Sequence, residues 1–182
     1  MKIMKWRYLF FVLAFIFGVP KEVSAQEVAL KTNVAYWMVT APNLGFEVAL
    51  NAKWSLDLSG VYKPWIFNGD KNIRFWLAQP ELRYWFCESF EGHFVGVHLH
   101  GAQYYATNKN RIYDGYLAGG GFVYGYNWIL SPRWNMEVLV GLGYARLWYK
   151  EMPNLPCMKC REDKVRDYVG PTKIALSFSY MF

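Results

Sequence analysis

Two cysteines three positions apart form the most specific chemical motif of the sequence, Cys157-Met158-Lys159-Cys160. A C-x-x-C pair can serve as a redox centre, as half of a zinc site or as a structural disulfide. The sequence has neither the βαβ pattern of a thioredoxin-like protein nor a second C-x-x-C. We therefore predict that Cys157 and Cys160 form a small disulfide that pins a loop in an oxidising compartment, with redox chemistry and metal binding as the alternatives. The third cysteine, Cys87, is left free or pairs with another chain.

The histidines are the next candidates for chemistry. His98 and His100 are two positions apart, so in a strand both lie on the same face. Two ligands are fewer than a typical zinc site needs, so we predict a hydrogen-bond network here, with neither a metal nor a cofactor. His93 lies near Ser89 and Glu91, the residue types that a lipid-modifying enzyme combines, but no catalytic motif surrounds them. The sequence therefore predicts a protein that is not an enzyme.

Polar and charged residues also recur at alternate positions of several segments, opposite an apolar face. They are Lys31, Asn33, Glu47, Asp57, Gln79, Glu81, Arg83, His98, His100, Glu137 and Lys173. If the apolar faces point outward into lipid, this set fills the lumen of a β-barrel, where an unpaired charge is costly. An eight-stranded interior is filled by side chains, so we predict a salt-bridged network that locks the barrel. A gated path for protons or small ions through this network is the alternative.

The elements that must position these residues are strands. The stretch Tyr168–Phe182 alternates strictly after a Gly-Pro break, with large apolar residues from Ile174 to Phe182 on one face. A side-chain period of two predicts a strand with one apolar face. A terminal aromatic resembles the C-terminal signal of bacterial outer-membrane barrels, so Phe178, Tyr180 and Phe182 are predicted to be read by the barrel-assembly machinery. An edge strand of a soluble sandwich is the alternative.

Other segments alternate in the same way. Pro80 inside one of them cannot donate to a strand ladder, so it either marks a bulge or counts against that strand. The segments are about Val28–Met38, Asn43–Leu50, Trp54–Trp65, Arg74–Phe86, His93–Ala106, Gly115–Ile129 and Trp134–Tyr149. Apart from the first, their connections are alternately short and long, which is typical of outer-membrane barrels. The aromatic residues next to the short turns or the C-terminus are predicted to form a girdle at one membrane interface. They are Trp54, Trp85, Phe86, Trp128, Trp134 and Phe182.

These patterns predict an all-β fold, an eight-stranded antiparallel up-and-down transmembrane β-barrel. Aromatics make up 20% of the chain and charged residues only 19%, yet beyond the N-terminal segment no apolar run approaches helix-spanning length. That combination favours a membrane that is crossed by strands rather than helices. A soluble lipocalin-like barrel, with the apolar faces turned inward, is the alternative.

The N-terminal segment indicates export. Three basic residues precede the apolar run Tyr8–Val19, and small residues lead to a predicted cleavage after Ala25. We therefore predict a signal peptide over residues 1–25, a barrel domain over residues 26–182 and an outer-membrane location. Removing the peptide lowers the net charge from +6 to +3, because it carries four basic residues and one acid. The basic character therefore does not indicate a nucleic-acid partner, and no Lys/Arg-rich run does so either.

Three stretches resemble a family of small exported proteins from the Bacteroides group, known as a domain of unknown function. They are Ala29–Trp65, QPELRYWF (Gln79–Phe86) and YVGPTKIALSFSY (Tyr168–Tyr180), the last preceded by the C-x-x-C loop. The resemblance covers nearly the whole chain after the signal peptide and implies an eight-stranded outer-membrane barrel. Genes of fimbrillin-like surface proteins beside those of the family imply a role near pili or adhesins. The family brings no catalytic residues.

We therefore expect a non-enzymatic outer-membrane barrel with a structural or interaction role at the cell surface, in the assembly or anchoring of fimbria-like structures. Its expected partners are outer-membrane lipid, the barrel-assembly machinery and fimbrial or other surface proteins. The predicted loop Glu151–Tyr168 is the candidate contact surface because basic residues gather there. They are Lys150, Lys159, Arg161, Lys164 and Arg166. The alternatives are a solvated basic loop near anionic lipopolysaccharide, and transport or binding of a small solute in the lumen.

Overall fold

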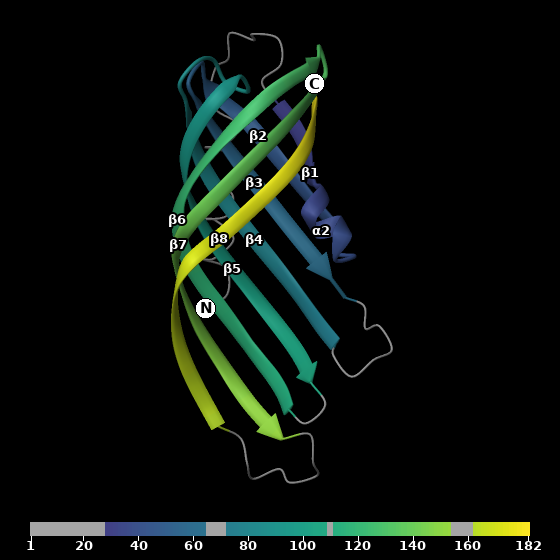
Figure 1. Cartoon of the computed structure of the whole chain (residues 1–182), viewed down its shortest axis with the longest axis vertical. Helices are drawn as coiled ribbons and strands as arrows, with labels where there is room; N and C mark the ends of the chain where they lie inside the picture. The colour runs from purple at the N-terminus through teal and green to yellow at the C-terminus, as the bar shows by residue number, and fades with distance from the viewer. Residues whose placement is uncertain (1–27, 65–71, 109–110, 154–161) are drawn as a thin grey trace, which may run out of the picture.

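Eight antiparallel strands form a closed ring sheet in the computed structural model, which describes residues 28–64, 72–108, 111–153 and 162–182 (Figure 1). The strands are β1 (Val28–Asn33), β2 (Asn43–Asn51), β3 (Trp54–Lys63), β4 (Asn72–Trp85), β5 (Gly92–Asn108), β6 (Arg111–Ser131), β7 (Trp134–Pro153) and β8 (Glu162–Met181). Each strand pairs with its neighbours in sequence, and β1 pairs with β8. The predicted all-β class and the eight antiparallel strands are confirmed. The predicted signal peptide lies outside the described residues.

The connections fall at two opposite ends of the ring. The turn end carries the tight connections β2–β3, β4–β5 and β6–β7, and the C-terminus of the chain lies there (Figure 1). At the opposite end, called the loop end, lie the strand ends that border residues 65–71, 109–110 and 154–161, which are outside the described residues. The β1–β2 connection differs, because its residues lie partway along the ring (Figure 1). In the described ranges, no helical segment has the length and apolar character needed to cross a bilayer.

The first predicted strand, Val28–Met38, is wrong in its second half. The strand β1 ends at Asn33, and the short helix α2 (Val34–Met38) follows it. Two asparagine side chains explain the change. The Asn33 side chain accepts a hydrogen bond from the Ala35 amide and so caps the helix. The Asn43 side chain hydrogen-bonds to both backbone groups of Asn33. Its Oδ1 atom accepts from the Asn33 nitrogen at 2.6 Å, and its Nδ2 atom donates to the Asn33 oxygen at 2.9 Å. These bonds take the place of those that a neighbouring strand would otherwise supply.

The predicted loop Glu151–Tyr168 is also wrong at both ends, because β7 continues to Pro153 and β8 begins at Glu162. Charged pairs replace apolar alternation in this part of the sheet. The Lys164 ammonium lies 2.6 Å from a Glu151 carboxylate oxygen on the neighbouring strand. Opposite charges on facing strands stabilise a sheet, but they leave no apolar period for a sequence pattern to detect.

One residue of β8 interrupts its regular alternation. Gly141 of β7 pairs with Lys173, but the next residue, Leu142, pairs with Pro171, so Thr172 is an extra residue in β8. A bulge of this kind reverses which side chains point inward on the strand beyond it. On the turn side of Thr172 the odd-numbered residues of β8 face inward. On the loop side the even-numbered residues do so, and Arg166 pairs with the inward-facing Leu147.

Glycines allow β6 and β7 to approach closely. Gly121 pairs directly with Gly143 across the two strands. A Cβ atom added to Gly121 would lie 2.3 Å from the Leu142 carbonyl oxygen. Gly101 on β5 differs, because a Cβ atom there would have no atom within 4 Å. The wall formed by β6 and β7 therefore depends on the absence of side chains at specific positions.

The substitution Gly121→Ala is expected to lower the free energy of unfolding by about 1–3 kcal/mol, because backbone atoms must move to admit the methyl group. The matched substitution Gly101→Ala is expected to be neutral or to stabilise by up to about 1 kcal/mol. Urea unfolding in detergent, followed by circular dichroism, measures both. Equal stability of the two variants would contradict the close packing of β6 on β7.

Candidate functional site

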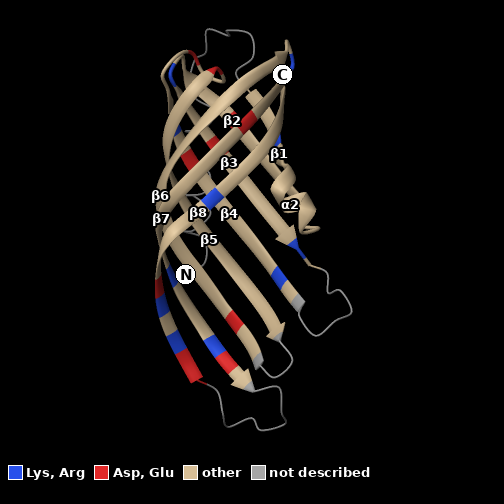
Figure 2. Cartoon of the chain, viewed as in Figure 1, with Lys and Arg blue, Asp and Glu red and all other residues tan. Residues whose placement is uncertain are grey.

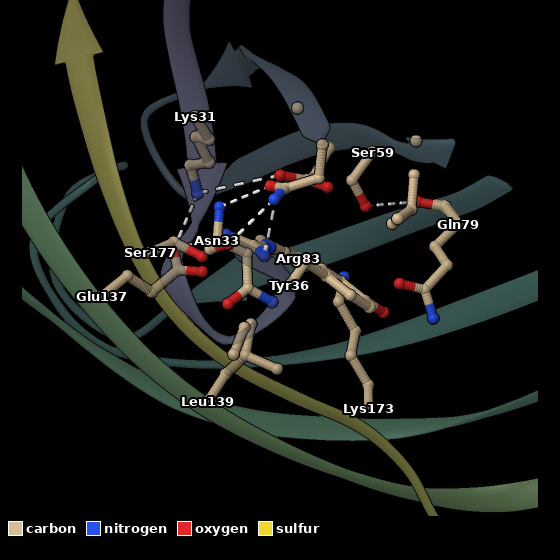
Figure 3. Close-up of a pocket in the computed structure, with 16 residues that line it drawn as sticks. Lys31, Asn33, Tyr36, Ser59, Gln79, Arg83, Glu137, Leu139, Lys173 and Ser177 are labelled. Carbon is tan, nitrogen blue, oxygen red and sulfur yellow. Dashed lines mark hydrogen bonds and ion pairs between the residues drawn. The ribbon is translucent and has the colours of Figure 1, made fainter. Parts of the chain in front are cut away.

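The ring interior holds a layer of charged side chains that are at most 7% exposed (Figure 3). Its acids are Glu47, Asp57, Glu81 and Glu137, and its bases are Lys31, Arg83 and Lys173. We call these seven residues the ionic layer. They come from β1, β2, β3, β4, β7 and β8, so the layer connects strands that are distant in sequence. Outward side chains of the same strands are mostly apolar, as the alternation requires.

Arg83 is the centre of the ionic layer. Its Nε atom lies 2.6 Å from Glu81 Oε1. Its Nη1 atom donates to Glu47 Oε2 at 2.9 Å and to Glu137 Oε2 at 2.7 Å. The guanidinium also lies 4.6 Å from the centre of the Phe94 ring. A planar guanidinium is suited to this role because it presents several donors in fixed directions and also packs on an aromatic face.

The lysines complete the pairing of the acids. The Lys31 ammonium lies 2.7 Å from Glu137 and also contacts Glu47, and Figure 3 shows Lys31, Glu137 and Arg83 pointing toward one another. Lys173 donates to Glu81 at 2.7 Å. Asp57 is the least satisfied member, because its Oδ1 atom has no partner among the described residues and borders a cavity of about 30 Å³.

An aromatic cluster closes the turn end of the interior. Trp85, Phe90 and Phe94 are buried, and the Trp85 ring lies 4.7 Å from that of Phe94. The turn between β4 and β5 folds inward, and the Phe90 carbonyl accepts hydrogen bonds from the side-chain Nδ2 atoms of Asn127 and Asn135. The prediction that Trp85 belongs to the outer girdle is therefore wrong. Its odd number already places it on the inward face with Arg83.

Two histidines lie on the loop side of the ionic layer. His98 and His100 are buried, and their rings stack with centres 5.4 Å apart. The His98 Nε2 atom is hydrogen-bonded to the hydroxyl of Thr172, the extra residue of β8, at 3.0 Å. The Nδ1 atoms of both histidines have no hydrogen-bond partner among the described residues. The interior therefore offers unused polar atoms at this level.

Beyond the histidines the interior opens into a cavity of about 550 Å³. Its walls are mainly apolar and come from β4 to β8. They include Phe75, Leu77, Ala102, Leu117 and Leu147. His100, Gln79 and Thr172 add polar groups, and Arg166 and Tyr168 face the cavity from β8. Sequence analysis missed this cavity, because the Thr172 bulge that turns Arg166 and Tyr168 inward leaves no signal in the apolar alternation.

The remaining predicted site residues that the structure describes lie outside the ionic layer and away from the two histidines. Asn33 is buried, caps α2 and accepts a hydrogen bond from the Leu176 amide instead of joining the ionic layer. Phe178 and Phe182 face outward at 36% and 66% exposure, and Tyr180 packs edge-on against Trp134. Cys87 is exposed and free. Cys157 and Cys160 lie outside the described residues.

Of the residues considered for catalysis or metal binding, those that the structure describes are not gathered into one centre. The Ser89 hydroxyl donates to the Asn51 carbonyl, whereas His93 is hydrogen-bonded to the Tyr124 hydroxyl. In the part of the chain that the structure describes, no group of three or more His, Cys, Asp or Glu residues is placed to hold a metal ion.

The ring and its interior define a class of protein: an all-β chain whose eight antiparallel strands enclose buried ion pairs. The chain belongs to the family described as "Protein of unknown function (DUF3575)", whose model matches residues 9–182. No curated protein matches the chain.

Proposed function

We propose that this protein is a non-enzymatic outer-membrane β-barrel with a structural or interaction role at the cell surface. The observation that carries the proposal is the outer face of the ring. Large apolar side chains on this face are exposed, among them Val97 at 48%, Phe122 at 74% and Ile174 at 65%. A soluble monomer rarely exposes a continuous apolar surface of this size, whereas lipid would cover it.

Aromatic residues border this apolar face at the turn end. The exposed predicted girdle residues are Trp54, Phe86, Trp128, Trp134 and Phe182. Ring contacts link them to neighbouring tyrosines, as in the pair Trp54–Tyr84, whose centres are 5.1 Å apart. Amphipathic rings of this kind favour the boundary between lipid and water.

A second aromatic band lies toward the loop end, and sequence analysis did not identify it. Its exposed members are Tyr62, Trp76, Tyr116 and Tyr144. On β6, Tyr116 and Trp128 are twelve positions apart. At about 3.3 Å per residue and a strand tilt of about 40°, this separation corresponds to about 30 Å along the ring axis. The hydrocarbon core of a bilayer has about the same thickness.

The filled interior favours a structural role over conduction. The aromatic cluster around Trp85 occupies the turn end, and the ionic layer lies behind it. Transport or binding of a small solute or proton through the lumen is the second candidate function. The unpartnered Asp57 Oδ1 atom beside the cavity of about 30 Å³ favours it.

The loop-end parts of β7 and β8 supply the candidate surface for interaction. Figure 2 shows residues of both charges along them. The carboxylates of Glu151 and Glu162 hydrogen-bond to Lys164 and raise the pKa of its ammonium group above the ordinary value. The described part of this surface therefore carries acids beside the basic residues expected from the sequence, of which Lys159 and Arg161 lie outside the described residues. Fimbrial or other surface proteins are its proposed partners, together with outer-membrane lipid and the barrel-assembly machinery.

The full chain refolded in detergent is expected to migrate faster on a gel before boiling than after it, because a closed membrane barrel resists the denaturing detergent. Protease resistance of the faster form is the second measurement. In planar bilayers, no channel events are expected at any pH. A protein that remains soluble without detergent and shows no mobility shift would contradict the membrane proposal, and steady conductance would favour the lumen as the functional site.

A further inference from the structure

The cavity at the loop end is built around a continuous row of paired inward positions. Leu77 pairs with Ala102, Ala102 with Leu117, and Leu117 with Leu147. Leu147 pairs in turn with Arg166 on β8. The row therefore crosses the wall from β4 to β8 through apolar side chains and ends at one cation.

The bulge at Thr172 turns this cation toward the cavity, where Arg166 lines the wall while its side chain stays exposed. Counting by twos from the outward-facing Ile174 would place Arg166 on the outer face of the ring. The extra residue reverses the alternation, so Arg166 and Tyr168 both line the cavity. Among the described residues, Arg166 makes no ion pair with a carboxylate. A cation beside an apolar row, with no carboxylate partner among the described residues, is suited to an anion that carries an apolar chain.

The lining of the cavity also supplies hydrogen-bonding groups. His100 is 7% exposed, lines the cavity and has an Nδ1 atom without a partner among the described residues. Gln79 and Thr172 also line this part of the wall. The volume of about 550 Å³ lies within the range of pockets that hold a small organic ligand, and mainly apolar walls with a few polar groups are typical of such sites.

We propose that this cavity binds an anionic amphiphile with one alkyl chain, such as a fatty acid. The carboxylate pairs with the Arg166 guanidinium, and the alkyl chain lies along the row of Leu147, Leu117, Ala102 and Leu77. The ionic layer carries four acids against three bases, so its formal charge is negative and it repels a carboxylate that would move deeper. This inference goes beyond the proposed structural role, and only its test uses the proposed membrane insertion.

The test uses the full chain in lipid nanodiscs made of neutral phosphatidylcholine. A decanoate with a photoreactive diazirine near the end of its chain is added, and labelled residues are located by mass spectrometry after illumination. Labelling of inward residues such as Leu117 is expected. Excess decanoate should suppress this labelling and decanol should not, because decanol lacks the charge. A phosphatidylglycerol with the same diazirine on its acyl chain, tested in parallel, shows whether a membrane lipid is the source of the amphiphile.

Two variants separate specific binding from partition into lipid. Arg166→Gln is expected to reduce interior labelling about tenfold, because it removes a charge-assisted hydrogen bond. Ala102→Phe is expected to abolish it by filling the cavity. Arg146→Gln is the matched control, since Arg146 is an exposed arginine on β7 that pairs with Asp167, and it should label like the wild type. Each variant is first shown to give the heat-modifiable form.

The outcomes distinguish this inference from the membrane proposal. Labelling confined to outward residues such as Leu142 would overturn the binding site and leave the membrane-spanning barrel intact. Equal competition by decanol, or unchanged interior labelling of Arg166→Gln, would overturn the assignment of an anionic ligand. No labelling of outward residues by the photoreactive lipid would contradict the membrane proposal itself.

Discussion

Replacing Arg83 with methionine is expected to lower the free energy of unfolding by roughly 3–5 kcal/mol. The guanidinium contacts Glu47, Glu81 and Glu137, all of which are almost fully buried. Methionine fills part of the same volume but leaves these carboxylates with fewer donors in a region of low polarity. The measurement is urea unfolding in detergent, or the yield of the heat-resistant form if the variant no longer refolds.

The matched control for Arg83→Met is Arg146→Met. Arg146 is half exposed, and its Nε atom lies 3.4 Å from an Asp167 oxygen, so its loss should cost at most about 1 kcal/mol. The double variant Arg83→Met with Glu137→Gln should recover part of the lost stability, because it also removes one acid from a layer that has lost a cation. Equal effects of the two arginine substitutions would show that the ionic layer is not what stabilises the ring.

Replacing Val97 with arginine is expected to lower the yield of folded, membrane-inserted protein severely. Val97 faces outward on β5 between Leu82 and Phe122, inside the apolar face that the proposed barrel turns to lipid. An arginine near the bilayer midplane of a barrel costs about 2–4 kcal/mol. Folding into liposomes at several urea concentrations, read from the mobility shift, measures this cost.

Val165→Arg is the matched control for the lipid-facing position. Val165 is exposed near the loop-end start of β8, and it pairs with Trp148, which in turn pairs with Tyr116 of the second aromatic band. The same substitution there should cost at most about 1 kcal/mol, because the side chain reaches water or the interface. If Val97→Arg were as well tolerated as Val165→Arg, the apolar face would not contact lipid. In that case the exposed residues would require a protein partner instead.

The strands were predictable wherever one face is apolar. Alternation from Leu44 to Leu50 and from Ile174 to Phe182 identifies each strand and the residues that share each of its faces. The pattern failed where hydrogen bonds or charges replace apolar contrast. The cap at Asn33 ends β1 early, and paired charges extend β7 and β8 into the predicted loop. Neither feature can be detected from the alternation of apolar residues, on which the prediction relied.

Less of the interior than of the fold could be predicted from the sequence. The members of the ionic layer follow from their alternate positions, but the pairing of Arg83 with Glu137 depends on the closed ring, which brings β4 and β7 around one interior. The cavity was not predictable. Its cation, Arg166, faces inward only because Thr172 adds one residue to β8, and a single extra residue cannot be seen in a sequence without its pairing partners.

The pairing of β1 with β8 also bears on the rate at which the ring closes during folding. It joins residues about 150 positions apart, such as Leu30 and Tyr180, through a contact that involves the shortest strand of the ring. Contacts between residues so distant in sequence form slowly, since the loop they close is almost the whole chain. All the other strands must therefore be ordered before the ring closes. Until then, the edges of β1 and β8 stay open to pairing with other chains.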